Sequence, residues 1–229
     1  SKNLADTDIK QGNEHFDILY FTGTGDTGRT LTGLNFQPDF FWGKSRSAGF
    51  QHIIYDSVRG TGTSKSLSSN QTTVEGHNSS HSNLTSFNSD GVTFGSTSST
   101  DILNYAGGEA VGWFWKGGGS AVTNNQGSRT SQVSANPSAG ISIGTFTAQS
   151  SGSHTYGHGL GVAPKFIITK SRNLNGGEWY CYHHSIGQNG WVKLNTSGAA
   201  TTGNSAAWGT SPTSTVFTYG AGLVNQGNI

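Results

Sequence analysis

The feature that most constrains the fold is an internal repeat. The segment "TGLNFQPDFFWGKSR" (32–46) aligns without gaps with "HGLGVAPKFIITKSR" (158–172), so that Pro38 meets Pro164 and both segments end in Lys-Ser-Arg. With gaps of one or two residues the match continues upstream ("YFTGTGDTGRTL" with "TFTAQSSGSHTY") and downstream ("IIYDSV" with "CYHHSI", "KSLSSN" with "VKLNTS", "GVTFG" with "VFTYG"). Two copies of one unit therefore account for most of the chain.

The repeat predicts where the units begin and end. We expect a leader at 1–14, a first unit at 15–116, a polar, Gly/Ser-rich connector at 117–140 and a second unit at 141–229. The first unit closes with the aromatic run "EAVGWFWKG" (109–117), for which the second unit has no equivalent. We expect the second unit to lack its last strand, either because the chain is cut short or because a neighbouring chain supplies the strand.

The local pattern is that of β-structure throughout. Short runs of β-branched and aromatic residues are bounded by Gly, Asn, Ser or Pro, and no segment of twelve or more residues has a helical period. Pro38 and Pro164 each come just before such a run, where a residue without an amide proton is tolerated. The sequence predicts an all-β protein of two tandem, sequence-related antiparallel β-sandwich units of jelly-roll-like form.

The amino-acid composition excludes several classes of binding partner. Charged residues make up 11% of the chain and the net charge is +1, so no electrostatic field attracts nucleic acid. No run approaches the ~20 apolar residues of a membrane span, and we expect no membrane insertion. The lone Cys181 excludes an internal disulfide, while 6 Trp, 7 Tyr and 12 Phe provide enough large side chains for a folded core.

Two motifs have the spacing of known sites but the wrong context. Gly23, Gly25 and Gly28 have the spacing of a dinucleotide-binding loop, yet no amphipathic helix follows, and the second copy keeps only Gly152. We interpret the segment as a hairpin turn. Ser142 stands in a G-x-S-x-G pattern, but the surrounding residues continue a strand instead of turning into a helix, so we interpret the match as chance.

Histidines and carboxylates give no indication of catalysis. His77 and His81, and again His154 and His158, are four apart in Gly/Ser-rich sequence, which favours surface loops over a metal site. We expect no metal and no cofactor.

Glycoside hydrolysis needs two carboxylates facing each other across the sugar. Asp56 and Asp90 are replaced in the second copy by His184 and a Ser/Thr-rich turn, and Glu178 stands alone. We therefore predict that the protein is not an enzyme.

The candidate binding residues are three tryptophans of the second copy, Trp179, Trp191 and Trp208. Each lies in sequence rich in Gly, Asn and Ser with little charge, a setting in which flat rings stack on sugars. Core packing is the alternative for each of them. The tryptophans of the first copy lie within strongly apolar strands and are predicted to be in the core.

Taken together, the blocks resemble a repeat of unassigned function found in virion proteins of marine tailed bacteriophages. The blocks that carry the resemblance occur in order: "FDILYFTGTG", "TGLNFQPDFFWGKSR", "IIYDSVRG", "LTSFNSDGVTFG" and "EAVGWFWKGGG", with "HGLGVAPKFIITKSR" in the second copy. The resemblance implies a structural or adhesive role on a phage particle and supplies no catalytic residues.

From this we expect a non-enzymatic phage virion protein at the particle surface, in a tail fibre, a spike or a capsid decoration. Its expected partners are other virion proteins and further copies of itself, with a trimer favoured, and its expected ligand is a host-surface glycan. A free carbohydrate-binding module and a glycan hydrolase are the alternatives.

Overall fold

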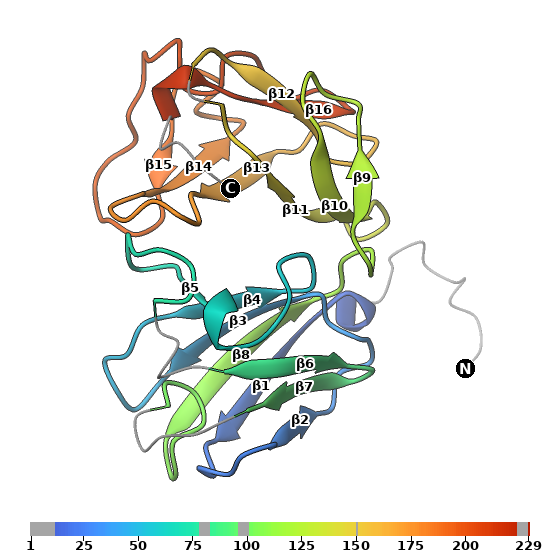
Figure 1. Cartoon of the computed structure of the whole chain (residues 1–229), viewed down its shortest axis with the longest axis vertical. Helices are drawn as coiled ribbons and strands as arrows, with labels where there is room; N and C mark the ends of the chain where they lie inside the picture. The colour runs from blue at the N-terminus through green and yellow to red at the C-terminus, as the bar shows by residue number, and fades with distance from the viewer. Residues whose placement is uncertain (1–11, 78–82, 96–100, 150, 224–228) are drawn as a thin grey trace, which may run out of the picture.

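The computed structural model describes residues 12–77, 83–95, 101–149, 151–223 and 229. These residues form sixteen short β-strands and three single-turn 3-10 helices, η1 (Gly12–Glu14), η2 (Thr63–Lys65) and η3 (Ala221–Leu223), with no α-helix among them. All strand pairings within the sheets are antiparallel (Figure 1). The prediction of an all-β protein is confirmed.

The first half of the chain builds two sheets. The larger has the order β1 (Phe16–Thr22), β8 (Glu109–Trp115), β3 (Phe40–Ser45), β4 (Ile53–Asp56), β5 (Leu67–Ser68). The smaller has the order β2 (Thr30–Thr32), β7 (Gly91–Phe94), β6 (Leu84–Asn88). The aromatic run that closes the first repeat is thus not an edge strand, because β8 lies between β1 and β3.

Residues of both sheets contribute to one apolar core in this half. Side chains alternate across each strand, so Phe41 and Phe114 face this core with ring centroids 5.0 Å apart. On the opposite face of the same two strands, Trp42 and Trp113 pair edge to face at 6.4 Å. The arrangement is sandwich-like, with a second aromatic row on the outer face of the larger sheet.

The second half forms three small sheets. Their strand orders are β11 (Ile141–Phe146), β10 (Ser131–Asn136), β9 (Val122–Asn124); β12 (His154–Gly157), β16 (Val216–Tyr219); and β13 (Phe166–Lys170), β14 (Trp179–His183), β15 (Val192–Lys193). Aromatic residues dominate the core of this half, including Tyr156, Tyr182, Trp208 and Tyr219, with Phe146 packed against it.

The segment 117–140, predicted as a connector, contains two strands. β10 pairs with β11 over the whole of both strands, from Ser131 opposite Phe146 to Asn136 opposite Ile141, and β9 pairs with its other edge. The polar composition concealed these strands because their buried side chains form hydrogen bonds: the Ser131 Oγ donates to the Gly157 carbonyl at 2.7 Å.

Gly23, Gly25 and Gly28 lie in the loop between β1 and β2. Gly25 and Gly28 have φ values of +77° and +78°, and Gly23 lies so close to the Tyr105 carbonyl that a side chain has no room there. A strand, β2, follows the loop instead of a helix. The glycines serve the loop and its close packing, but the prediction of a hairpin turn was wrong, because β1 pairs with β8 and β2 pairs with β7 in a different sheet.

The β3–β4–β5 and β13–β14–β15 sheets have the same strand order and occupy matching places in the two repeats. Phe40 lies opposite Asp56, and Phe166 lies opposite His183. The counterpart of Asp56 is therefore His183, one residue before the His184 that the sequence alignment paired with it.

A lysine with the same hydrogen bonds lies at the C-terminal end of β3 and of β13. The Nζ of Lys44 donates to the carbonyl of Ser45 at 2.6 Å, and the Nζ of Lys170 donates to the carbonyl of Ser171 at 2.9 Å. Each ammonium also donates to a carbonyl of the following loop. The matching Lys-Ser-Arg triplets thus perform the same local task.

A hydrogen bond from a backbone amide to an asparagine side chain also occurs in both repeats. Asn70 accepts from the His52 amide at 3.0 Å, and Asn195 accepts from the Trp179 amide at 3.1 Å. His52 directly precedes β4, and Trp179 is the first residue of β14. Asn195 is thus the counterpart of Asn70, two residues before the Ser197 that the sequence alignment chose. The corrected alignment brings identical residues into identical roles.

Candidate functional site

A buried ionic cluster lies where the two halves meet. The Arg59 guanidinium binds Asp56 at 2.5 Å and Glu75 at 2.8 Å, and the second oxygen of Glu75 binds Arg172 of the other half at 2.7 Å. Burial by itself lowers the pKa of Arg59, but the two carboxylates outweigh it and the pKa is raised. The Arg59 guanidinium consequently stays charged at neutral pH, and the cluster joins the two halves through Glu75 and Arg172.

Trp179 reaches across the same boundary. Its indole N–H donates to the carbonyls of Ser68 at 2.9 Å and Gln71 at 3.1 Å, both in the first half. Its ring packs with Ile54 and Leu67 in a small apolar cluster. This tryptophan is 5% exposed and belongs to the boundary between the halves.

The other predicted tryptophans lie within the second half. Trp208 is 1% exposed, and its N–H donates to the Gly190 carbonyl at 3.0 Å. Trp191 is half-buried, packs against the same core and contacts Tyr180 edge to face. The structure gives Trp179 and Trp208 the core position that was the alternative to sugar stacking, and it does not bring the three rings together as one platform.

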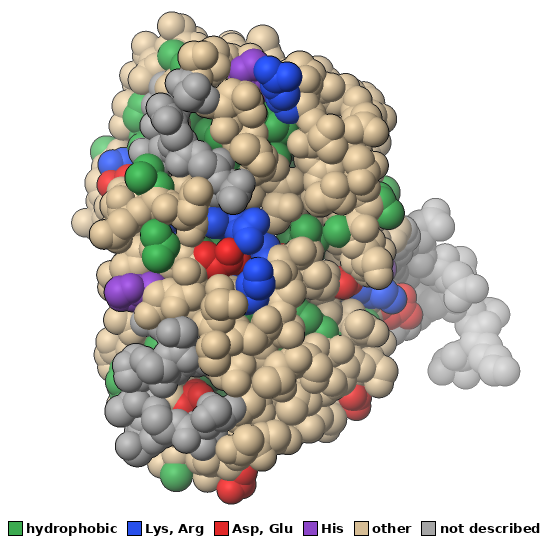
Figure 2. Space-filling model, viewed as in Figure 1, with side chains coloured by type: hydrophobic (Ala, Val, Ile, Leu, Met, Phe, Trp, Pro, Cys, Tyr) green, Lys and Arg blue, Asp and Glu red, His purple; other side chains and the backbone are tan. Residues whose placement is uncertain are grey.

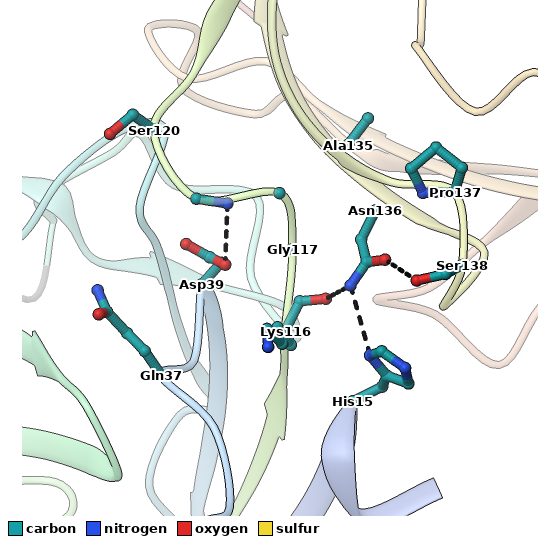
Figure 3. A pocket seen from close by; sticks show the side chains of 12 residues that line it. His15, Gln37, Asp39, Lys116, Gly117, Ser120, Ala135, Asn136, Pro137 and Ser138 are labelled. Atoms are coloured by element: carbon teal, nitrogen blue, oxygen red, sulfur yellow. Dashed lines mark hydrogen bonds between the residues drawn. The ribbon is translucent and has the colours of Figure 1, made fainter. Parts of the chain in front are cut away.

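A polar pocket of about 630 Å³ opens beside the boundary (Figure 3). Its lining comes from the residues before β1 and β3, from 116–120 after β8, and from 135–138 at the end of β10. Sequence reasoning missed this site because its residues are scattered over four segments, two of which lie in the supposed connector.

The buried polar groups of the pocket are Asp39 and Asn136. The Asp39 carboxylate accepts from the Gly119 amide at 3.3 Å (Figure 3). Asn136 donates to the Lys116 carbonyl at 3.2 Å and accepts from the Ser138 hydroxyl at 2.7 Å. Carboxylate, amide and backbone groups of this kind hydrogen-bond neutral polar ligands such as sugar hydroxyls.

The pocket holds a single carboxylate, that of Asp39, among its lining residues. The other carboxylates of interest are engaged elsewhere or stand alone: Asp56 in the ionic cluster, Glu178 with Lys193 and Asn195, and Asp90 half-buried in the β6–β7 turn. No facing pair of the kind a glycosidase uses is formed by these residues.

The motif residues have structural partners. Ser142 lies in the middle of β11 and donates to the His158 carbonyl at 2.6 Å, so it does not stand on a strand-to-helix turn. His158 is buried, and burial lowers its pKa against the opposing effect of the hydrogen bond that its ring makes to the Thr213 carbonyl. The prediction that this histidine lies in a surface loop was wrong. His77 is exposed, His154 is half-buried, and His81 lies outside the described residues.

Within the described part of the chain, no three His, Cys, Asp or Glu side chains gather as a metal site would require. Across those same ranges, no helix has the length and apolar character needed to span a bilayer.

Fold and pocket together define an all-β protein of small antiparallel sheets with a polar pocket beside the boundary of its two halves. The chain belongs to the family described as a domain of unknown function, DUF7483, whose sequence profile matches residues 11–228. No curated protein matches the chain, and no solved structure matches it. The family match covers both halves together.

Proposed function

We propose that this protein is a non-enzymatic structural and adhesive module of a phage virion, built as two tandem, jelly-roll-like sandwich units and displayed on the particle surface. The observation that carries the proposal is where the few charged side chains of the protein lie. The ionic cluster of Asp56, Arg59, Glu75 and Arg172 is buried in the boundary between the halves, where it supports the fold.

The outer surface agrees with this role. In Figure 2 the visible face is mostly neutral polar atoms and backbone, with basic and acidic side chains side by side near its middle. A neutral polar surface on a rigid β scaffold suits a protein that presents itself to the medium, and multivalent display raises weak binding by roughly 10² to 10⁴. The phage setting is supported by the sequence resemblance alone.

Mass spectrometry of purified particles tests the virion role. We expect the protein in washed, density-purified virions at a copy number that fits a symmetric assembly, and a trimer by light scattering of the isolated protein. Detection only in the unpurified lysate contradicts the proposal.

The pocket is the candidate glycan site, because its buried polar groups suit a neutral ligand. Glycan arrays with the native protein and with Asp39→Asn test it, and Asp90→Asn is the matched control because Asp90 lies in the β6–β7 turn and does not line the pocket. We expect any glycan signal to fall for Asp39→Asn alone. Equal signals for all three proteins contradict the assignment of the pocket.

The hydrolase alternative is tested by polysaccharide cleavage. Release of reducing ends that one Asp or Glu substitution abolishes establishes an enzyme and overturns the proposal. Binding by the isolated monomer, together with absence from virions, favours the free carbohydrate-binding module.

A further inference from the structure

Asp39 is a buried carboxylate on the wall of the polar pocket. Its side chain is 4% exposed, and among the described residues it forms one hydrogen bond, the long one of 3.3 Å from the Gly119 amide to Oδ2. The ion pairs of the described chain do not include it, although Lys116 and His15 line the same pocket. A buried negative charge without a cation is unfavourable, because burial removes its water and nothing replaces it.

Strand pairing does not require this carboxylate. Asp39 and its repeat counterpart Lys165 directly precede the equivalent strands β3 and β13. The Asp39 carbonyl accepts from the Ser57 amide at 2.8 Å, and the Lys165 carbonyl accepts from the His184 amide at 2.9 Å. The two copies thus use this position through the same backbone hydrogen bond, with an exposed lysine in one copy and a buried aspartate in the other. The burial of a charge at Asp39 therefore has a cause other than the fold of the repeat.

The carboxylate of Asp39 is accessible from the pocket. In Figure 3, one oxygen faces Gly119 and the other points to the side where Gln37 and Ser120 lie. This second oxygen, Oδ1, accepts no hydrogen bond from the part of the chain that the structure describes. The pocket volume of about 630 Å³ is that of a small-molecule site. A bound sugar can therefore donate to the oxygen that the protein leaves unpaired.

We propose that the pocket selects glycans that carry a free amino group, with the Asp39 carboxylate binding the ammonium. This inference rests on the proposed function, which supplies the sugar, and adds the charge that the preferred sugar carries. A charge-assisted hydrogen bond is about twice as strong as a neutral one, so an ammonium gains more from this carboxylate than a hydroxyl does. A sugar carboxylate at the same place meets a like charge and is rejected.

The remaining polar groups of the pocket suit the hydroxyls of the same sugar. Ser120 and Ser138 line the pocket and are exposed, so their hydroxyls can donate or accept. Lys116 is exposed as well, and its ammonium is solvated and screened. Its repulsion of a second ammonium is therefore weak compared with direct contact between that ammonium and the buried Asp39.

NMR titration of the native protein with four probes tests the proposal. D-Glucosamine, D-glucose and D-glucuronate share one ring type and differ in charge, and ethanolamine carries the ammonium without the ring. At pH 6, where the sugar amine is protonated, we expect glucosamine to shift the amides of Asp39, Gly119 and Asn136. Its dissociation constant should be at least about tenfold below that of glucose, with glucuronate the weakest sugar and ethanolamine weaker than glucosamine.

Two variants identify the group responsible. Asp39→Asn keeps the shape of the side chain and removes its charge, so we expect glucosamine to bind within about twofold of glucose. Asp90→Asn is the matched control, because Asp90 lies in the β6–β7 turn and does not line the pocket, and the preference for glucosamine should persist. Circular dichroism and thermal melting establish that both variants are folded.

The possible failures are distinguishable. Equal affinities of the native protein for glucosamine and glucose overturn the amino-sugar inference and leave the glycan site standing. A preference that Asp39→Asn retains overturns the inference as well, as does ethanolamine binding as tight as that of glucosamine. Absence of binding by all three sugars, or amide shifts confined to residues outside the pocket, overturns both this inference and the assignment of the pocket as a glycan site.

Discussion

Glu75 and Arg172 join the two halves of the chain through side chain and backbone at once. The Arg172 guanidinium donates to one Glu75 oxygen from Nε at 3.0 Å and from Nη2 at 2.7 Å, while the Glu75 amide donates to the Arg172 carbonyl at 2.8 Å. The other Glu75 oxygen binds Arg59. One carboxylate from the first half thus binds an arginine of each half, and Asp56 supplies the second negative charge of the cluster.

Glu75→Gln keeps the shape of this side chain and removes its charge. We expect it to lower the free energy of unfolding by about 3–5 kcal/mol, because it leaves the buried Arg59 short of one carboxylate. Glu109→Gln is the control, since the Glu109–Arg46 pair is exposed and worth at most about 1 kcal/mol. Urea denaturation measures both, and equal losses for the two variants contradict the role given to the buried cluster.

Trp179→Phe removes the two indole hydrogen bonds across the boundary. We expect it to cost about 1–3 kcal/mol more than Trp191→Phe, because two carbonyls lose their donor in the first variant. The Trp191 indole nitrogen is buried without a hydrogen-bond partner among the described residues, so its replacement sacrifices packing only. Chemical denaturation of the two variants measures their free energies of unfolding. A larger loss of stability for Trp191→Phe would refute the bridging role of Trp179.

Lys170 gives the protein a pH-dependent stability. Burial lowers its pKa to about 8, against the opposing effect of Glu178, while the same lysine in the unfolded chain keeps a pKa near 10.5. Between these values the unfolded chain binds more protons, so the contribution of Lys170 makes the free energy of unfolding rise with pH from about 8 to 10.5.

NMR titration of the Lys170 Cε resonance measures this pKa directly. The difference in unfolding free energy between the native protein and Lys170→Met should change across the same pH window and be flat below it. A Cε resonance that titrates near 10.5 would show that the ammonium is solvated in the folded state.

Cys181 is predicted to be unreactive while the protein is folded. Burial raises its pKa to about 11 against a weaker opposing effect of the Leu194 backbone, so the thiol is protonated at pH 8. We expect a thiol reagent at pH 8 to label the chain only in denaturant, or natively at the rate of unfolding. Rapid labelling of the native protein would contradict the buried position in β14.

The repeat in the sequence predicted the all-β class and the equivalent strands, because alternating apolar residues and paired turns are local signals. It placed Phe40 over Phe166 correctly, since both lie in the ungapped block. It misaligned Asp56 and Asn70 by one and two residues, because loop lengths differ between the copies and only strand register fixes the pairing.

The pocket and the boundary between the halves could not be predicted from the sequence. Asp39 and Asn136 come together only when β3 and β10 are in place, and nothing local marks either residue. Trp179 was singled out for its polar neighbours, yet those neighbours include Asn195, which holds its backbone, and its ring is covered by residues more than a hundred positions earlier in the chain.

The strands in 117–140 have a mechanical consequence. A flexible Gly/Ser-rich linker would extend under a pulling force and let the two halves separate. Here β10 is hydrogen-bonded along β11, so tension applied to one half passes straight into a sheet of the other. The joint between the two halves therefore transmits a pulling force as a stiff rod does.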